Sequence, residues 1–166
     1  MSEIIATLKK DYIYNLMVKE KRQDGRGFKD SRDIKLETNV ISKAEGSAKV
    51  TLGNTQVLVG VKLQTGTPFP DSQDEGVIIT NLELNPIASP EFEPGPPRED
   101  AIEMARVVDR GIRESGAIDI KKLCITVGES VWIVFIDVHI LNDDGNIIDA
   151  SCLAAIAALM TTIVPN

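Results

Sequence analysis

The sequence has few cysteine, histidine and aromatic residues. The scarcity of cysteine and histidine excludes several kinds of disulfide and metal site. Its 166 residues include two cysteines, one histidine and 4% aromatic residues. Cys124 and Cys152 lie in different segments, a spacing that fits neither a disulfide framework nor a zinc site. We expect both to be buried small hydrophobes of a protein in a reducing compartment. A lone His139 excludes a histidine metal cluster, and we expect neither a metal site nor a cofactor.

Phosphate-binding motifs and long apolar runs are also missing. The chain has no GxxxxGK[ST] and no GxGxxG after a strand, so neither a P-loop nor a dinucleotide site is supported. No stretch reaches the roughly 18 apolar residues of a membrane-spanning helix. The first apolar run is interrupted by Lys9, Lys10 and Asp11, unlike that of a signal peptide. We therefore expect a cytoplasmic protein that does not contact a membrane.

Positive charge is in deficit. Eighteen Lys and Arg against 25 Asp and Glu give a net charge of -7, which excludes a broad basic surface for nucleic acid. Contact with RNA or DNA would need a local patch. The hydrophobic fraction of 43% and the charged fraction of 26% are those of an ordinary globular protein.

The spacing of apolar residues predicts the order of the secondary structure. Three- and four-residue steps predict a helix over residues 3–20, and alternation predicts four strands between residues 32 and 84, with a hairpin turn at Gly53-Asn54. Five prolines in residues 85–98 predict a loop. The expected elements after it are a helix over 99–115, strands at 123–127 and 131–141, and an apolar helix that begins near Asp149. This order predicts an α+β fold in which helices pack on a mixed or antiparallel sheet. Because the chain stops shortly after an apolar helix, we expect it to be truncated at its C-terminus.

The strand over residues 131–141 carries the first group of candidate functional residues. Side chains alternate between its two faces: Val131, Ile133, Phe135, Asp137, His139 and Leu141 share one, and Trp132, Val134, Ile136, Val138 and Ile140 share the other, which we expect to be entirely core. Towards the end of the strand, Asp137 and His139 approach the acidic turn Asp143-Asp144. Such a cluster is suited to acid–base chemistry, and the alternative is a structural Asp–His pair.

The helix over residues 99–115 carries the second group. At 100° per residue, Arg106, Arg110 and Arg113 fall within a stripe of about 60°, opposite an apolar face. Arginine suits phosphate because its planar fork donates two parallel hydrogen bonds. The alternative is a set of surface ion pairs, Glu103 with Arg106 and Asp109 with Arg113, with Glu114 close to Arg110. Gly111 costs about 1 kcal/mol relative to Ala inside a helix, which indicates close packing or close approach of a backbone there.

Several motifs in their order resemble the RNase PH family of phosphorolytic exoribonucleases. They are Arg22–Arg26 (RQDGR), Glu45–Ala48 (EGSA), Leu52–Val57 (LGNTQV), Asp144-Gly145 and Ala150-Ser151. The resemblance implies an RNase PH-like fold, with an N-terminal helix and lead-in over residues 1–22 and an incomplete domain over 23–166 whose second half is missing.

The segments FEPGPPREDAIEMARVVDRGIRES and VWIVFIDVHIL more narrowly resemble the non-catalytic ring subunits of archaeal exosomes, which are RNA-degrading complexes. The resemblance implies a ring of alternating chains with a catalytic RNase PH-like subunit, RNA-binding cap subunits, and single-stranded RNA as ligand. Arg106 and Arg110 match an arginine pair that binds RNA beside the partner's active site. Arg113 is added as an RNA-binding residue from the helix geometry alone.

Compared with active members of the family, His139 and Asp144 stand at degenerate active-site positions. Asp144 matches the second of two acids, His139 replaces the first, and Asn146-Ile147-Ile148 replaces a phosphate-binding loop. The resemblance therefore implies no catalytic residues in this chain. Two alternatives stay open: an active phosphate-dependent 3′→5′ exoribonuclease that uses Asp137, His139 or Asp144, and a structural or small-molecule-binding domain.

Overall fold

The computed structural model describes residues 2–165, which form two units, the first ending at Asp33 and the second beginning at Ile34. The first unit holds α1 (Ser2–Val18), which matches the predicted helix except that it begins one residue and ends two residues earlier. After it, the RQDGR motif forms a local turn. Arg26 donates from Nε to Asp24 at 2.7 Å and from Nη1 to the carbonyl of Asp30 at 2.7 Å, and Arg22 donates to the carbonyl of Phe28. The hydrogen bond from Arg26 holds the pKa of Asp24 below its ordinary value.

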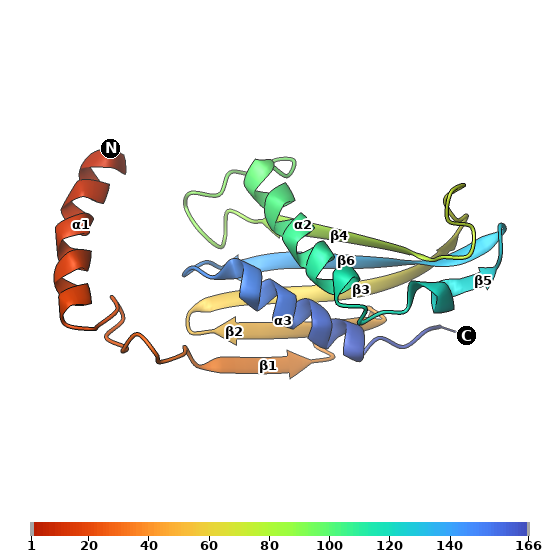
Figure 1. Ribbon diagram of the computed structural model, residues 1–166, viewed down its shortest axis with the longest axis horizontal. Coiled ribbons are helices and arrows are strands. Elements are labelled where there is room, and N and C mark those ends of the chain that lie inside the picture. Colours follow the sequence, from red (N-terminus) through yellow and green to blue (C-terminus); the bar gives the residue numbers. More distant parts are fainter. Residues whose placement is uncertain (1, 166) are drawn as a thin grey trace. The chain divides into compact units, whose positions relative to one another are not determined.

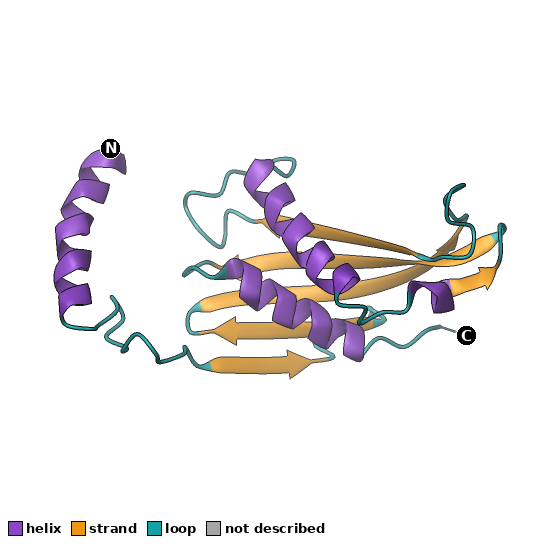
Figure 2. Ribbon diagram, in the orientation of Figure 1, coloured by secondary structure: helices purple, strands orange, loops and turns teal. Residues whose placement is uncertain are grey.

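The second unit is a mixed sheet on which helices pack, as predicted. Its elements are β1 (Ile34–Thr38), β2 (Gly46–Leu52), β3 (Thr55–Gly66), β4 (Val77–Leu84), α2 (Glu99–Glu114), the 3-10 helix η1 (Ile120–Leu123), β5 (Cys124–Thr126), β6 (Ser130–Asn142) and α3 (Ile147–Met160). The strand order is β1-β2-β3-β6-β4, and β5 pairs with β6 (Figures 1 and 2). Only β4 and β6 run parallel, and the other pairs are antiparallel.

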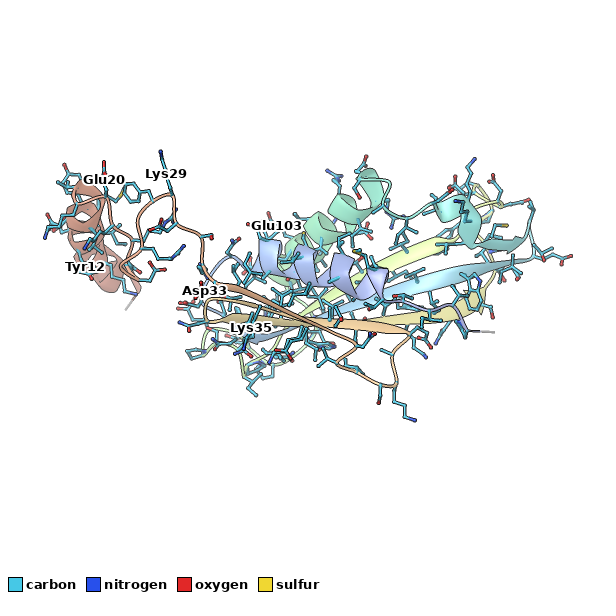
Figure 3. The ribbon with its side chains drawn as sticks, turned by 90° about the horizontal axis from the view of Figure 1, so that it is seen from below. Tyr12, Glu20, Lys29, Asp33, Lys35 and Glu103 are labelled. Atoms are coloured by element: carbon cyan, nitrogen blue, oxygen red, sulfur yellow. The ribbon has the colours of Figure 1, made fainter. Side chains whose placement is uncertain are left out.

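The core lies between the sheet and the two helices α2 and α3, which cover the same face (Figure 3). Alternation decides which strand residues reach it. On β6 the even-numbered residues from Val134 to Ile140 are buried, as predicted, but Trp132 is only half-buried, so this face is not entirely core. The facing side of α3 consists mainly of alanines, whose small side chains let the helix lie close to β2 and β3.

Two glycines meet specific demands of the backbone in this unit. Gly53 has φ +61° and begins the predicted β2–β3 turn. Gly46, at the start of β2, lies against the end of α3, where a Cβ atom would overlap the carbonyl oxygen of Ala158 and the side chain of Thr162. This contact holds the C-terminal end of α3 against the sheet.

The cysteines differ from the expectation that both are buried. Cys124 and Cys152 are free thiols, as the spacing indicated, but both are only partly buried. Cys152 packs against the edge of the core. Burial raises the pKa of Cys152, with a smaller contribution from Asp149. Within residues 2–165, none of the helices is long and apolar enough to cross a membrane.

Candidate functional site

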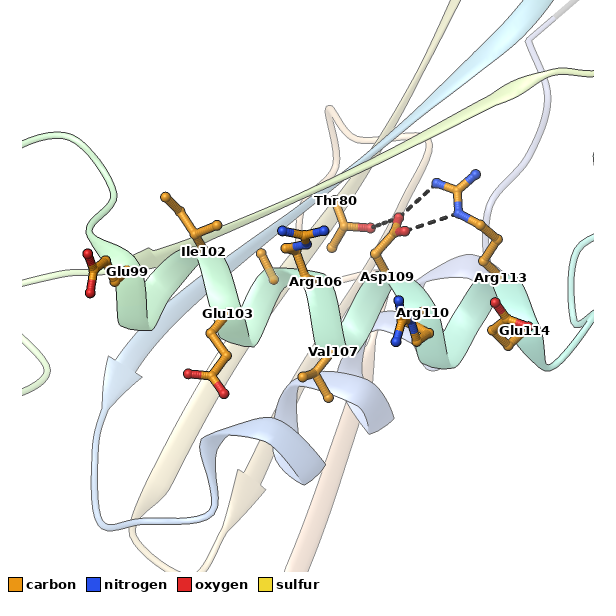
Figure 4. Close-up of a pocket in the computed structure, with 11 residues that line it drawn as sticks. Thr80, Glu99, Ile102, Glu103, Arg106, Val107, Asp109, Arg110, Arg113 and Glu114 are labelled. Atoms are coloured by element: carbon orange, nitrogen blue, oxygen red, sulfur yellow. Dashed lines mark hydrogen bonds and ion pairs between the residues drawn. The ribbon is translucent and has the colours of Figure 1, made fainter. Parts of the chain in front are cut away.

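A shallow groove of about 830 Å³ runs along the solvent side of α2. The helix is amphipathic, with Ala101, Val108 and Ile112 buried against the sheet. Glu99 and Asp100 lie in its first turn, where negative charge favours the N-terminal end of the helix dipole. The groove is lined by Thr80 of β4 and by ten residues of α2, namely Glu99, Ile102, Glu103, Ala105, Arg106, Val107, Asp109, Arg110, Arg113 and Glu114 (Figure 4).

Arg106 and Arg110 are the two cations of this groove that stay unpaired. Both side chains are exposed, and neither makes a hydrogen bond or ion pair with any part of the chain that the structure describes. The surface pairs considered from the sequence, Glu103 with Arg106 and Arg110 with Glu114, do not form. Two free guanidinium groups four residues apart, separated by about 6 Å along the helix axis, can each donate two parallel hydrogen bonds to an anion.

Arg113, by contrast, is bound within the protein. Its Nε and Nη2 donate to the carboxylate of Asp109 at 3.0 and 3.1 Å, and Nη2 also donates to the carbonyl of Ile78 at 3.0 Å. Asp109 in turn accepts a hydrogen bond of 3.1 Å from the hydroxyl of Thr80. The predicted Asp109–Arg113 ion pair is therefore confirmed. The arginine stripe divides into two free cations and one that is bound.

The candidate residues at the end of β6 have their partners on the neighbouring strand β4. His139 Nδ1 lies 3.2 Å from Glu83 of β4, and Asp137 accepts a hydrogen bond of 3.2 Å from the amide of Asn81. These pairs follow the parallel register of β4 and β6, in which Glu83 lies opposite His139 and Asn81 opposite Asp137. Both pairs lie on the face of the sheet opposite the helices. Among the described residues, no ion pair joins His139 to the acidic turn Asp143-Asp144 or to Asp137, because the neighbouring strand supplies its partner.

Asp144 belongs to a separate hydrogen-bonded turn between β6 and α3. The hydroxyl of Thr55, which is fully buried, donates to the carbonyl of Gly145 at 2.8 Å and accepts from the N–H of Asp144 at 3.0 Å. The Asp144 carboxylate accepts a hydrogen bond of 3.2 Å from Asn54. Asn146 then enters α3 with φ +61°, in the left-handed region. This turn is held to the β2–β3 hairpin on both sides.

Of the predicted site residues, the structure thus brings the three arginines into one groove and gives His139 and Asp144 different neighbours. Thr80 and Ile78 were missed as part of the arginine site. No pattern in the sequence indicates them, because their contact with Arg113 and Asp109 depends on how α2 packs on β4.

Comparison with known proteins gives the family. A model of the 3′ exoribonuclease (RNase PH) family, domain 1, matches residues 30–165. The chain belongs to the RNase PH family. Its relatives within that family include the exosome complex component Rrp42 of Methanosarcina mazei, 96% identical over the whole chain, and that of Archaeoglobus fulgidus, 61% identical over 98% of it. The chain spans 62% of the length of the first of these relatives and 63% of the second.

Solved structures of RNase PH-like chains share the fold. A chain from the Archaeoglobus fulgidus exosome with RNA bound to the active site superposes with a TM-score of 0.94 at 62% identity, over 98% of this chain and 64% of that one. Rice Rrp46 superposes with a TM-score of 0.64 at 21% identity over 85% of this chain and 61% of that one, which shows the fold alone.

Proposed function

We propose that this chain is part of an RNA-binding subunit of an archaeal exosome-type complex that degrades RNA from the 3′ end. The observation that carries the proposal is the free pair Arg106 and Arg110 in the groove of α2, on a chain whose net charge is otherwise acidic. In such a setting, two unpaired guanidinium groups give a local site for the phosphates of single-stranded RNA. Arg113 as a third RNA ligand stays a prediction, and its Nη1 is the nitrogen left for that role.

The relatives support this assignment and suggest the partners. Proteins 96% and 61% identical to this chain are named exosome components, and a similar chain occurs in an exosome with RNA bound to its active site. The proposed partners are a catalytic RNase PH-like subunit, which alternates with this one in a ring, and RNA-binding cap subunits. The complex would work in the cytoplasm.

We propose further that the subunit does not catalyse phosphorolysis itself. In phosphorolysis, inorganic phosphate attacks the last phosphodiester and releases the terminal nucleotide as a diphosphate, which leaves a 3′-hydroxyl on the shortened RNA. This step depends on donors that position and neutralise the attacking anion. The segment Asn146-Ile147-Ile148, at the start of α3, contains no hydroxyl and no guanidinium group. His139 is engaged with Glu83, and Asp144 accepts a hydrogen bond from Asn54. The Arg106–Arg110 pair would therefore bind RNA for a neighbouring chain.

Reconstitution tests this proposal. A labelled single-stranded RNA is incubated with inorganic phosphate and with the full-length protein alone, its catalytic partner alone, or the assembled complex. We expect shortening of the RNA by the complex, weaker activity of the partner alone, and none of the full-length protein alone. Phosphate-dependent shortening by the full-length protein alone would instead favour the alternative, an active exoribonuclease. Absence of RNA binding by the complex would favour a structural domain.

A further inference from the structure

The carboxylate of Asp109 lies at the centre of the network beside the two free arginines. Its Oδ1 accepts from the Thr80 hydroxyl and from Arg113 Nη2, each at 3.1 Å, and its Oδ2 accepts from Arg113 Nε at 3.0 Å (Figure 4). Both oxygens are therefore occupied. The Asp109 side chain is 26% exposed and that of Arg113 42% exposed, so the pair borders the groove.

Asp109 has a second possible cation within reach. On a helix, side chains three and four residues apart are neighbours and form ion pairs. Arg106 precedes Asp109 by three residues, and Arg113 follows it by four. Arg106 and Arg113 therefore compete for one carboxylate. In the structure Arg113 forms the ion pair with Asp109, and Arg106 makes no ion pair within the described residues.

The reason for this outcome lies in β4. Arg113 donates to the carbonyl of Ile78, and Thr80 donates to Asp109, so two groups of the strand hold the Asp109–Arg113 pair on the sheet side of α2. Arg106 would have to pair with Asp109 without this support. A bidentate ion pair that is also bonded to the sheet is stronger than a single exposed pair at i,i+3 spacing.

We propose that Arg113 and Thr80 are positioning residues that hold the Asp109 carboxylate away from Arg106 and so keep Arg106 free for an RNA phosphate. The proposal rests on the proposed function of the Arg106–Arg110 pair. It replaces the direct contact with RNA that the helix geometry predicted for Arg113 by an indirect role, in which Arg113 neutralises and orients an acid that would otherwise compete with the RNA for Arg106.

The consequence is a specific pattern of affinities. Removing Arg113 leaves an unneutralised carboxylate next to the RNA site. At a separation of about 6 Å in water, its repulsion of a phosphate corresponds to about a threefold loss of affinity at low salt. Removing the charge of Asp109 as well should abolish this loss, because the unneutralised carboxylate that Arg113→Ala exposes is then gone.

The experiment is a double-mutant cycle on the assembled complex containing the full-length protein. Binding of a labelled single-stranded RNA is measured at low salt for Arg113→Ala, Asp109→Asn and the double variant. We expect about a threefold loss for Arg113→Ala, wild-type or tighter binding for Asp109→Asn, and near wild-type binding for the double variant. If adding Asp109→Asn to Arg113→Ala fails to restore binding in the double variant, Arg113 is a direct ligand and the proposal is wrong. If Arg113→Ala leaves binding unchanged, its role is only structural and the proposal is equally wrong.

Two further variants keep these outcomes separate from misfolding and from failure of the proposed function. Arg113→Gln keeps a polar side chain with N–H donors at about the position of the Arg113 Nε but removes the charge, and it should show the same loss and the same rescue even if Arg113→Ala assembles poorly. Arg106→Ala, measured in parallel, reports on the proposed function. If Arg106→Ala binds RNA like the wild type, the proposed RNA site itself is wrong. If Arg106→Ala weakens binding but Asp109→Asn does not rescue the Arg113 variants, only the role of Arg113 is overturned.

Discussion

The side-chain amide of Asn54 donates a hydrogen bond of 3.2 Å to the carboxylate of Asp144, which lies 90 residues later in the chain. Asn142 adds a second bond by donating to the carbonyl of Asn54 at 2.6 Å. These bonds join the turn between β2 and β3 to the turn that leads into α3. Asp144 is therefore part of a structural connection between these two turns.

Thr55 at the centre of this connection gives the first prediction. Its buried hydroxyl bonds to the backbone of both Asp144 and Gly145. Thr55→Val keeps the shape of the side chain but removes these bonds and leaves the N–H of Asp144 and the carbonyl of Gly145 without that partner. We expect the free energy of unfolding to fall by about 1–3 kcal/mol, measured by urea denaturation.

Ser151 on α3 is the matched control. Its hydroxyl is equally buried but has no hydrogen-bond partner among the described residues. Ser151→Ala should therefore leave the stability unchanged or raise it by a few tenths of a kcal/mol, since Ala also favours the helix. Equal losses for the two variants would mean that the Thr55 hydrogen bonds contribute nothing beyond burial.

A second prediction concerns the free arginine pair. Changing both Arg106 and Arg110 to Ala in the assembled complex should weaken RNA binding with little effect on folding, because both side chains are exposed and unpaired. The slope of log K against log salt should flatten by roughly 0.7 for each phosphate of the single strand that the variant no longer neutralises. Titrations of a labelled RNA at several salt concentrations measure this slope.

Lys121 and Lys122 supply a control with the same change in net charge. They lie in η1 outside the groove and form exposed ion pairs with Asp74 and Asp119, which contribute little to stability. The Lys121→Ala, Lys122→Ala double variant should keep the wild-type slope. If it flattens the slope as much as the arginine variant does, the effect is one of overall charge and the groove is not the RNA site.

Gly111 on α2 gives a third prediction. The close packing considered for it is absent within the described residues, because a Cβ atom there would meet no heavy atom within 4 Å. Gly111→Ala should therefore raise the free energy of unfolding by about 1 kcal/mol through helix propensity. Thermal unfolding measures the change.

Gly46→Ala is the opposite case in the same assay. Its new methyl group would overlap the backbone at the end of α3, so the variant should unfold at a lower temperature than the wild type. A lower unfolding temperature for Gly111→Ala as well would show that the surface of α2 does not tolerate a side chain at that position.

The fourth prediction concerns acid stability. The Glu45 carboxylate accepts a hydrogen bond from Lys62 and another of 3.1 Å from the N–H of Leu63. The bond from Lys62 is the main reason that the pKa of Glu45 lies below its ordinary value of 4.5, although partial burial opposes the shift. Because the pKa is lower in the folded state, this carboxylate stabilises the protein above the unfolded pKa, and the stabilisation is lost as the pH falls through the folded pKa.

Comparison with Glu45→Gln isolates this contribution from those of the other carboxylates. The wild type should be more stable than Glu45→Gln at pH 6 to 7, and the difference should shrink steadily below about pH 4.5. Urea denaturation at a series of pH values measures it. A difference that stays constant from pH 7 to pH 3 would show that the charge of Glu45 is not what stabilises this contact.

The features that sequence predicted correctly are local ones. The alternation in residues 46–66 and the pair Gly53-Asn54 predicted the β2–β3 hairpin, and the apolar spacing in residues 99–115 predicted the buried face of α2. Both depend on backbone geometry that repeats every two or every 3.6 residues, so neighbouring residues contain the information. The 3-10 helix at Ile120–Leu123 was not predicted, because four residues are too few to show a period.

The sequence by itself determined which residues share a face: three arginines on one side of α2, and Asp137 with His139 on one side of β6. Only the tertiary structure decided which of them have partners. His139 pairs with Glu83, and Arg113 rather than Arg106 holds Asp109, because β4 brings Glu83, Thr80 and Ile78 alongside. The spacing of residues in a helix decides which side chains can form an ion pair. Which of two such ion pairs forms depends on hydrogen bonds from β4, and the packing of the whole sheet determines the register of that strand.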